Sequence, residues 1–228
     1  MTLLSARANL ATMVSPPPST GRLTIPVAHG QLEAILKEPA APVAAVVVCH
    51  PHPLGGGTMN NNVVYRAAKS LGEAGLAVLR FNFRGVGAST GRHDGGAGEE
   101  EDTLAALELM EQRHPDLPLW IAGFSFGARV GLTVGVREAR VKKLLGIGLA
   151  LRMFDYAFLD ACDKPKAVIQ AANDEYGGRA EIEAAFDAMA APKRLWIVDD
   201  STHLFPQHLA ALETAAREAA GWLLIPQV

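Results

Sequence analysis

Ser125 lies at the centre of a G-x-S-x-G pattern that follows a short apolar run and leads directly into a helix-like segment. A chain that reverses from strand to helix at one residue needs nearly side-chain-free neighbours two positions away, because strand and helix approach each other closely there. Gly123 and Gly127 meet that need. Such a turn lifts the serine hydroxyl above the edge of the sheet. The pattern therefore predicts a nucleophile elbow with Ser125 as the nucleophile.

A serine hydroxyl becomes an effective nucleophile when a neutral histidine accepts its proton and a carboxylate orients that histidine. On a strand-turn-helix scaffold of this kind, the acid and then the histidine follow the serine, each in a loop just after a strand. Asp174 follows the apolar run 166–171, and His203 follows the run 194–198. Glu175 is the alternative acid, but the shorter side chain closer to the strand end favours Asp174.

Two backbone N–H groups would have to stabilise the oxyanion that forms when the serine attacks a carbonyl group. Phe126, directly after the serine, offers the first. The loop after residue 49 offers the second, and we expect His52 to supply it, because Pro51 and Pro53 have no N–H group. A metal site built from His50 and His52 is the alternative. No acidic residue lies nearby in the sequence to complete such a site, so we expect neither a metal nor a cofactor.

Strand-like and helix-like segments alternate along most of the chain, which predicts an α/β fold with a largely parallel sheet covered on both faces. The first two strands are expected to form a hairpin, with His29 as a solvated residue of its turn. The expected strands are residues 22–28, 31–37, 43–49, 76–82, 119–122, 143–148, 166–171 and 194–198. The expected helices are residues 62–74, 99–113, 126–136, 179–189 and 207–223.

The composition suits an ordinary globular protein, with 49% hydrophobic and 20% charged residues in 228. A net charge of −3 gives no basic footprint for nucleic acid, and no apolar run is long enough to span a membrane. Cys49 and Cys162 lie far apart in unlike contexts, so we expect free thiols and a cytoplasmic location. Residues 1–20 are expected to be a flexible, proline-rich leader, and residues 21–228 a single domain.

Several of these motifs resemble those of the small, cap-less α/β-hydrolases near the dienelactone-hydrolase and carboxylesterase branch. The motifs are the His-Pro-His-Pro run at 50–53, the Asn-Phe-Arg-Gly-Val-Gly-x-Ser-x-Gly run at 82–91, the elbow at 123–127, Asp174 and His203. The resemblance spans residues 22–222. It implies an eight-stranded, mostly parallel twisted sheet with helices on both faces, a minimal lid, and a Ser125, Asp174, His203 triad. Dienelactone hydrolases use a cysteine nucleophile where this chain has Ser125, so their lactone specificity is not carried over.

The chain has only residues 148–164 where larger members of this fold insert a lid, so we expect an open site. Phe154 and Tyr156 in that segment either line the substrate pocket or pack in the core, and Leu54 and Phe124 are further candidates for the pocket lining. Arg84 is expected to be structural and to pair with one of the four acidic residues at 99–102.

An open site favours small or short-chain acyl groups. The sequence thus predicts a serine hydrolase of carboxylic esters that acts on a small molecule, with no nucleic-acid or membrane partner. The alternatives are an acyltransferase or peptidase with the same triad, and a non-catalytic binding protein on a hydrolase fold.

Overall fold

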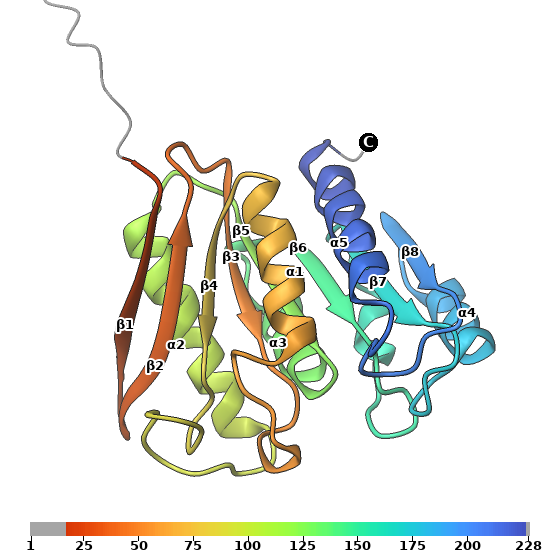
Figure 1. Ribbon diagram of the computed structural model, residues 1–228, viewed down its shortest axis with the longest axis horizontal. Helices are drawn as coiled ribbons and strands as arrows, with labels where there is room; N and C mark the ends of the chain where they lie inside the picture. The colour runs from red at the N-terminus through yellow and green to blue at the C-terminus, as the bar shows by residue number, and fades with distance from the viewer. Residues whose placement is uncertain (1–16, 227–228) are drawn as a thin grey trace, which may run out of the picture.

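The computed structural model describes residues 17–226, which form one eight-stranded sheet with helices on both faces (Figure 1). The strands are β1 (Ser19–Val27), β2 (Gly30–Glu38), β3 (Ala44–Cys49), β4 (Leu76–Phe81), β5 (Leu119–Phe124), β6 (Val141–Ile147), β7 (Lys166–Ala171) and β8 (Lys193–Val198). The α-helices are α1 (Asn62–Glu73), α2 (Ala97–Arg113), α3 (Phe126–Arg137), α4 (Arg179–Ala188) and α5 (Leu209–Leu224). Short 3-10 turns occupy Pro53–Gly55 and Ala157–Leu159.

The strands lie in the order β1-β2-β4-β3-β5-β6-β7-β8. The hairpin of β1 and β2 is antiparallel and joins β4 in antiparallel fashion, whereas every pairing from β4 through β8 is parallel. This is the α/β-hydrolase fold, as the sequence predicts. Each expected strand and helix is present, with ends displaced by a few residues.

Strand β3 shows why the apolar runs do not alternate between apolar and polar residues. All six of its residues are buried, and alternate side chains enter two separate cores. Val47 and Cys49 face one core, packed under α2 and α3, whereas Val46 and Val48 face the other, packed under α1 and α5. A strand covered on both faces must be apolar at every position. Figure 1 shows these two helix layers, with α1 and α5 on the near side of the sheet.

The carboxyl ends of the parallel strands meet at one edge of the sheet. The loops after β3, β5, β7 and β8 leave the sheet along this edge, and they carry His52, Ser125, Asp174 and His203. Four segments that are far apart in the sequence are thus brought to one place, where sheets of this kind hold their ligands. No helix in the described part of the chain is both long and apolar enough to cross a membrane.

The N-terminal boundary differs from the expected one. Ser19 and Thr20, expected in the leader, belong to β1 and pair with Glu38 and Lys37. The hydroxyl of Ser19 also donates a hydrogen bond to the Glu38 carboxylate at 3.1 Å, which extends the hairpin by two residues. The rest of the expected leader, residues 1–16, lies outside the described residues.

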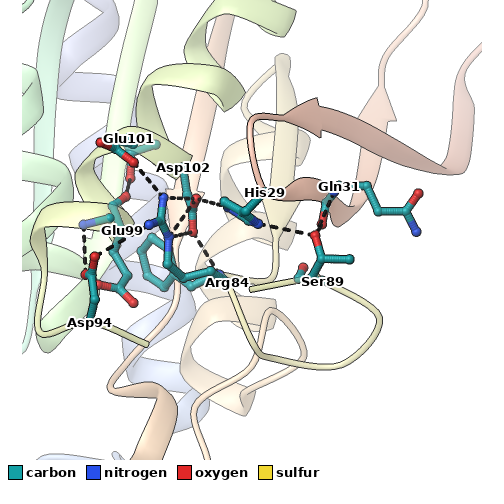
Figure 2. A network of polar contacts seen from close by, with 12 residues as sticks. His29, Gln31, Arg84, Ser89, Asp94, Glu99, Glu101 and Asp102 are labelled. Carbon is teal, nitrogen blue, oxygen red and sulfur yellow. Dashed lines mark hydrogen bonds and ion pairs between the residues drawn. The ribbon is translucent and has the colours of Figure 1, made fainter. Parts of the chain in front are cut away.

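The loop between β4 and α2 is held by an ion-pair network around Arg84 (Figure 2). Asp102 is fully buried; it accepts hydrogen bonds from the Arg84 guanidinium at 2.8 Å and from the Arg84 backbone N–H at 2.8 Å. Glu101 and Asp94 also pair with Arg84. Of the four acidic residues expected as partners, Asp102 and Glu101 therefore take the role, and Asp94 adds to them.

His29 contradicts its predicted solvated role. Its Nε2 atom lies 3.1 Å from the Asp102 carboxylate, and its Nδ1 atom lies 3.2 Å from the hydroxyl of Thr90 (Figure 2). The hairpin turn between β1 and β2 folds back over the loop after β4, and this contact leaves the His29 side chain 23% exposed. Local sequence could not show this, because Asp102 is 73 residues away.

Replacement of Asp102 tests whether the network supports the fold. Arg84 is 11% exposed, so Asp102→Asn leaves a largely buried guanidinium without its main counter-charge and should lower the free energy of unfolding by about 3 kcal/mol. Glu101→Gln is the matched control, because the Glu101 side chain is 75% exposed; its cost should stay below about 1 kcal/mol. Urea unfolding of both variants measures the difference. Equal losses would contradict a special role for Asp102.

Candidate active site

Ser125 stands at the reversal between β5 and α3 with φ 56° and ψ −120°, a backbone conformation that non-glycine residues rarely adopt. Its N–H donates a hydrogen bond to the carbonyl of Ile147 at 2.9 Å, which fixes the turn on the neighbouring strand β6. A Cβ atom at Gly123 would overlap the carbonyl of Gly127, and a Cβ atom at Gly127 would overlap the carbonyl of Cys49. Both glycines are therefore required for the turn to close.

Ser125, His203 and Asp174 form one continuous hydrogen-bonded chain. The Oγ atom of Ser125 lies 2.9 Å from Nε2 of His203, and Nδ1 of His203 lies 2.8 Å from Oδ2 of Asp174. An ionised carboxylate can only accept, so Nδ1 carries the proton and Nε2 is free to accept the serine hydroxyl. All three residues are buried, at 8%, 5% and 3% exposure respectively. This arrangement can draw the proton from the serine as its oxygen attacks.

The structure places Asp174 rather than Glu175 on the imidazole. Asp174 also accepts a hydrogen bond from the backbone N–H of Tyr176 at 2.8 Å, which holds the carboxylate in its turn. Glu175 lies beside the same histidine but accepts from the His203 backbone N–H at 3.2 Å. The shorter side chain reaches the ring because it leaves the strand end closer to it, as the sequence reasoning expected.

Gln170 is a supporting residue that the sequence reasoning missed. Its amide group donates to Oδ2 of Asp174 at 3.0 Å and to the carbonyl of Gly177 at 2.7 Å, and its oxygen accepts from the N–H of Leu149 at 2.8 Å. The side chain is completely buried. A polar residue within the apolar run 166–171, four residues before the acid, was the available signal. Because buried amides need partners, it had to bond to something nearby.

Two aromatic rings hold the imidazole of His203 in place. Phe124 lies beside it with ring centroids 4.9 Å apart, and Tyr176 meets it edge-on at 4.8 Å. Phe124 lines the site as expected, and Tyr176 was not foreseen. The imidazole is thus fixed by two hydrogen bonds and two packed rings, which leaves it little freedom to leave the serine.

The side chains of Phe126 and His52, whose backbone N–H groups are the candidate oxyanion donors, pack against each other. Their ring centroids are 4.9 Å apart, and within residues 17–226 neither backbone N–H group has a protein acceptor. Burial, followed by the neighbouring His93, lowers the pKa of His52, and its Nδ1 atom accepts a hydrogen bond from the N–H of Leu54 at 3.2 Å. His52 is therefore neutral near pH 7, and its ring serves the loop structure.

His93 packs against both the His52 ring and the Phe126 ring, with its centroid 5.5 Å from that of Phe126. The centroids of the two imidazoles are 4.8 Å apart, and Nδ1 of His93 contacts the fully buried carboxylate of Glu99 at 2.8 Å. Glu99 also accepts from the N–H of Gly96 at 2.8 Å, at the start of α2. The loop that carries the His52 N–H group is thus packed against a second carboxylate and histidine pair.

His50 is a structural residue, which argues against the alternative of a metal held by His50 and His52. Its Nδ1–H donates to the carbonyl of Pro51 at 2.6 Å, and its Nε2 atom accepts from the N–H of Phe83 at 3.0 Å. Neither nitrogen is free to bind a cation. Within residues 17–226, no three His, Cys, Asp or Glu side chains gather in a group that could hold a metal ion.

An open cleft of about 530 Å³ lies over Ser125. Leu54 and Phe124 line it, as expected, together with residues that were not foreseen. These further residues include Asn61, Met153, Glu175, Tyr176 and Leu204.

Phe154 and Tyr156, by contrast, line a second cavity of about 770 Å³ between residues 151–160 and α4. Tyr156 is 4% exposed and packs in the core, so the packing alternative holds for it. The Tyr156 hydroxyl still donates to the backbone carbonyl of Ser125 at 3.5 Å, so this ring packs beneath the nucleophile rather than in the cleft. Met153 lines both cavities.

The fold and the serine, histidine and carboxylate geometry define an α/β serine hydrolase. A family model described as serine aminopeptidase S33 matches residues 40–157, slightly more than half of the chain, and the protein belongs to this family of α/β hydrolases. The match ends before Asp174 and His203, so it covers only the nucleophile of the three residues.

Solved structures agree with this assignment over nearly the whole chain. An α/β serine hydrolase homologue from Coxiella burnetii is 34% identical with a TM-score of 0.82, covering 87% of this chain and 96% of that protein. A Xanthomonas campestris α/β serine hydrolase without a lid is 31% identical with a TM-score of 0.84, covering 93% and 98%. The predicted resemblance to cap-less α/β-hydrolases is confirmed.

A curated relative, an uncharacterised protein of Rickettsia prowazekii, is 43% identical over 140 residues. The alignment covers 60% of this chain and 58% of the relative, so the chain spans less than two thirds of the relative's length.

The protonation state of His50 tests whether its imidazole is buried beside the active site as the structure shows. Burial lowers its pKa to about 4, so the unfolded chain binds this proton more readily between pH 6.5 and 4. The stability that the neutral ring contributes is complete above pH 6.5 and is lost as the pH falls toward 4, by about 3 kcal/mol. Imidazole nitrogen shifts in a pH titration by NMR should show His50 neutral at pH 5. A midpoint near 6.5 would contradict its burial.

Proposed function

We propose that this protein hydrolyses carboxylic esters through an acyl-enzyme on Ser125, with His203 as general base and Asp174 as its orienting acid. The observation that carries this proposal is the unbroken chain of hydrogen bonds from Ser125 Oγ through His203 to Asp174, which opens on a cleft. A protein that only binds a ligand does not require this alignment, in which a serine with a strained backbone faces an imidazole of fixed tautomer.

In the first half of the reaction, the Ser125 oxygen forms a bond to the acyl carbon while its proton passes to Nε2 of His203. The carbonyl electron pair moves onto oxygen, and in this proposal the N–H groups of Phe126 and His52 donate to the resulting oxyanion. When the carbonyl re-forms, the bond to the alcohol breaks, and the departing oxygen takes the proton from Nε2. Asp174 stabilises the imidazolium between these two transfers.

Water then completes the cycle by the same route. It gives a proton to Nε2 as its oxygen attacks the acyl carbon, and Ser125 regains a proton as the acid is released. Every proton moves between the substrate, water, Ser125 and one imidazole, so the cycle needs no cofactor. We further propose a small-molecule substrate, without nucleic-acid or membrane partners.

The shape of the site supports short acyl groups rather than long lipid chains. Residues 148–164 form turns and a short 3-10 segment beside the cleft, with no cap over it in the described chain. The cytoplasm remains our proposed location, supported by the two free, buried thiols of Cys49 and Cys162.

A second candidate is release of N-terminal amino acids from peptides, which the description of the matched family favours. The same three residues would cleave an amide, and the substrates that the cleft admits would differ. Aminoacyl p-nitroanilides distinguish it: faster turnover of these than of acyl esters would favour the peptidase and overturn the ester proposal.

Loss of the serine hydroxyl is the direct test. Wild-type protein should hydrolyse short p-nitrophenyl acyl esters and react with a fluorophosphonate probe, whereas Ser125→Ala should lose at least about 10³-fold in kcat and all labelling. Ser19→Ala is the control, since this exposed serine contacts only the hairpin, and it should behave as wild type. Equal inertness of wild type and Ser125→Ala toward esters and probe would support the binding-protein alternative.

A further inference from the structure

Large apolar side chains are exposed around the cleft over Ser125. Eight large hydrophobic residues in the described chain are exposed, and four of them line this one cleft. They are Leu54, Met153, Leu204 and Tyr176, at 79%, 55%, 56% and 37% exposure. Such a cluster on an otherwise polar surface marks a place where an apolar ligand binds. We call these four residues the apolar rim.

The cleft also carries a single formal charge. Among its lining residues Glu175 is the one carboxylate, and neither lysine nor arginine is present. Within residues 17–226 the Glu175 carboxylate has no ion-pair partner, and its Oε2 atom accepts the backbone N–H of His203 at 3.2 Å. The Arg152 guanidinium binds the backbone carbonyl of Glu175, at 3.0 Å, and not its carboxylate. The ring of His203 bonds to Ser125 at 2.9 Å, and Glu175 lines the same cleft as the nucleophile.

The second cavity shares Met153 with the cleft, and its lining is also mainly acidic. Asp155, Asp160 and Glu181 line it, with Arg152 as its one cation. Arg152 is neutralised by two hydrogen bonds to the Glu181 carboxylate, at 2.8 and 2.9 Å. Two acidic side chains therefore remain uncompensated by the residues of this cavity.

From these observations we infer which class of acyl group the substrate carries. This inference rests on the ester hydrolysis proposed above. The substrate has an acyl chain that is apolar near the scissile carbonyl and neutral or positively charged at its far end. The apolar rim binds the chain, and Glu175 is the specificity-determining residue that favours a cationic terminus and disfavours an anionic one. An acyl group with a terminal carboxylate is thus a poor substrate.

Three p-nitrophenyl esters with six-carbon acyl chains test this assignment. Their chains end in a methyl group, a quaternary ammonium group or a carboxylate. At low salt, wild type should show a kcat/KM ratio of ammonium to carboxylate ester of about tenfold or more, because a charge near Glu175 is only partly screened. The ratio should fall at high salt, where surface charges are screened.

The variant Glu175→Gln should reduce this ratio several-fold, since it removes the charge and keeps an acceptor for the His203 N–H group. The ratio is taken within one variant, so any general loss of rate divides out. Asp116→Asn is the matched control, because this exposed residue lies before β5, at the opposite end of the strand from Ser125. It removes the same charge and should leave the ratio as in wild type.

The outcomes separate the two proposals. Turnover of all three esters at equal kcat/KM, or a ratio that Glu175→Gln leaves unchanged, overturns the inference about the acyl group while ester hydrolysis stands. If Asp116→Asn lowers the ratio as much as Glu175→Gln does, the effect comes from the net charge of the protein. That result would also overturn the inference about the acyl group. Failure of wild type to turn over any ester or to react with the fluorophosphonate probe overturns the proposed function itself.

Discussion

The structure depends on the reversal of the chain at Ser125, where a strand becomes a helix without an intervening loop. This reversal is possible because Gly123 and Gly127 have no side chains, so that the first turn of α3 lies against both β5 and the end of β3. The same close approach brings the loop after β3, which carries His52, against Phe126 at the start of α3. One steric requirement thus positions the nucleophile and both candidate oxyanion donors.

The two partners of the serine come from strands further along the same sheet. Their loops leave from one edge, and a buried amide, Gln170, connects the acid to the backbone of Leu149 and Gly177. Polar groups enclosed in this way need full sets of hydrogen bonds, and this set is full for the acid. Rigid support of this kind makes a small number of charged groups effective, since no reorganisation is needed when the proton moves.

Much of this could be predicted from the sequence because the decisive signals are local. Three apolar runs each followed by a polar loop gave the positions of Ser125, Asp174 and His203, and a parallel sheet brings such loops together. The sequence left wrong or undecided those contacts that depend on how loops fold over one another. The pairing of His29 with Asp102 and the placement of Phe154 and Tyr156 are set by such packing, which no local pattern records.

The absence of a cap from the described chain has a consequence for the timing of the reaction. An acyl group on Ser125 would lie in a cleft whose rim is exposed, so water reaches it by diffusion and no lid must open or close between turnovers. Alcohols would reach the same carbon by the same path. The division between hydrolysis and transfer to another alcohol would then follow the concentrations and reactivities of the competing nucleophiles, because residues 17–226 form no lid that could select between them.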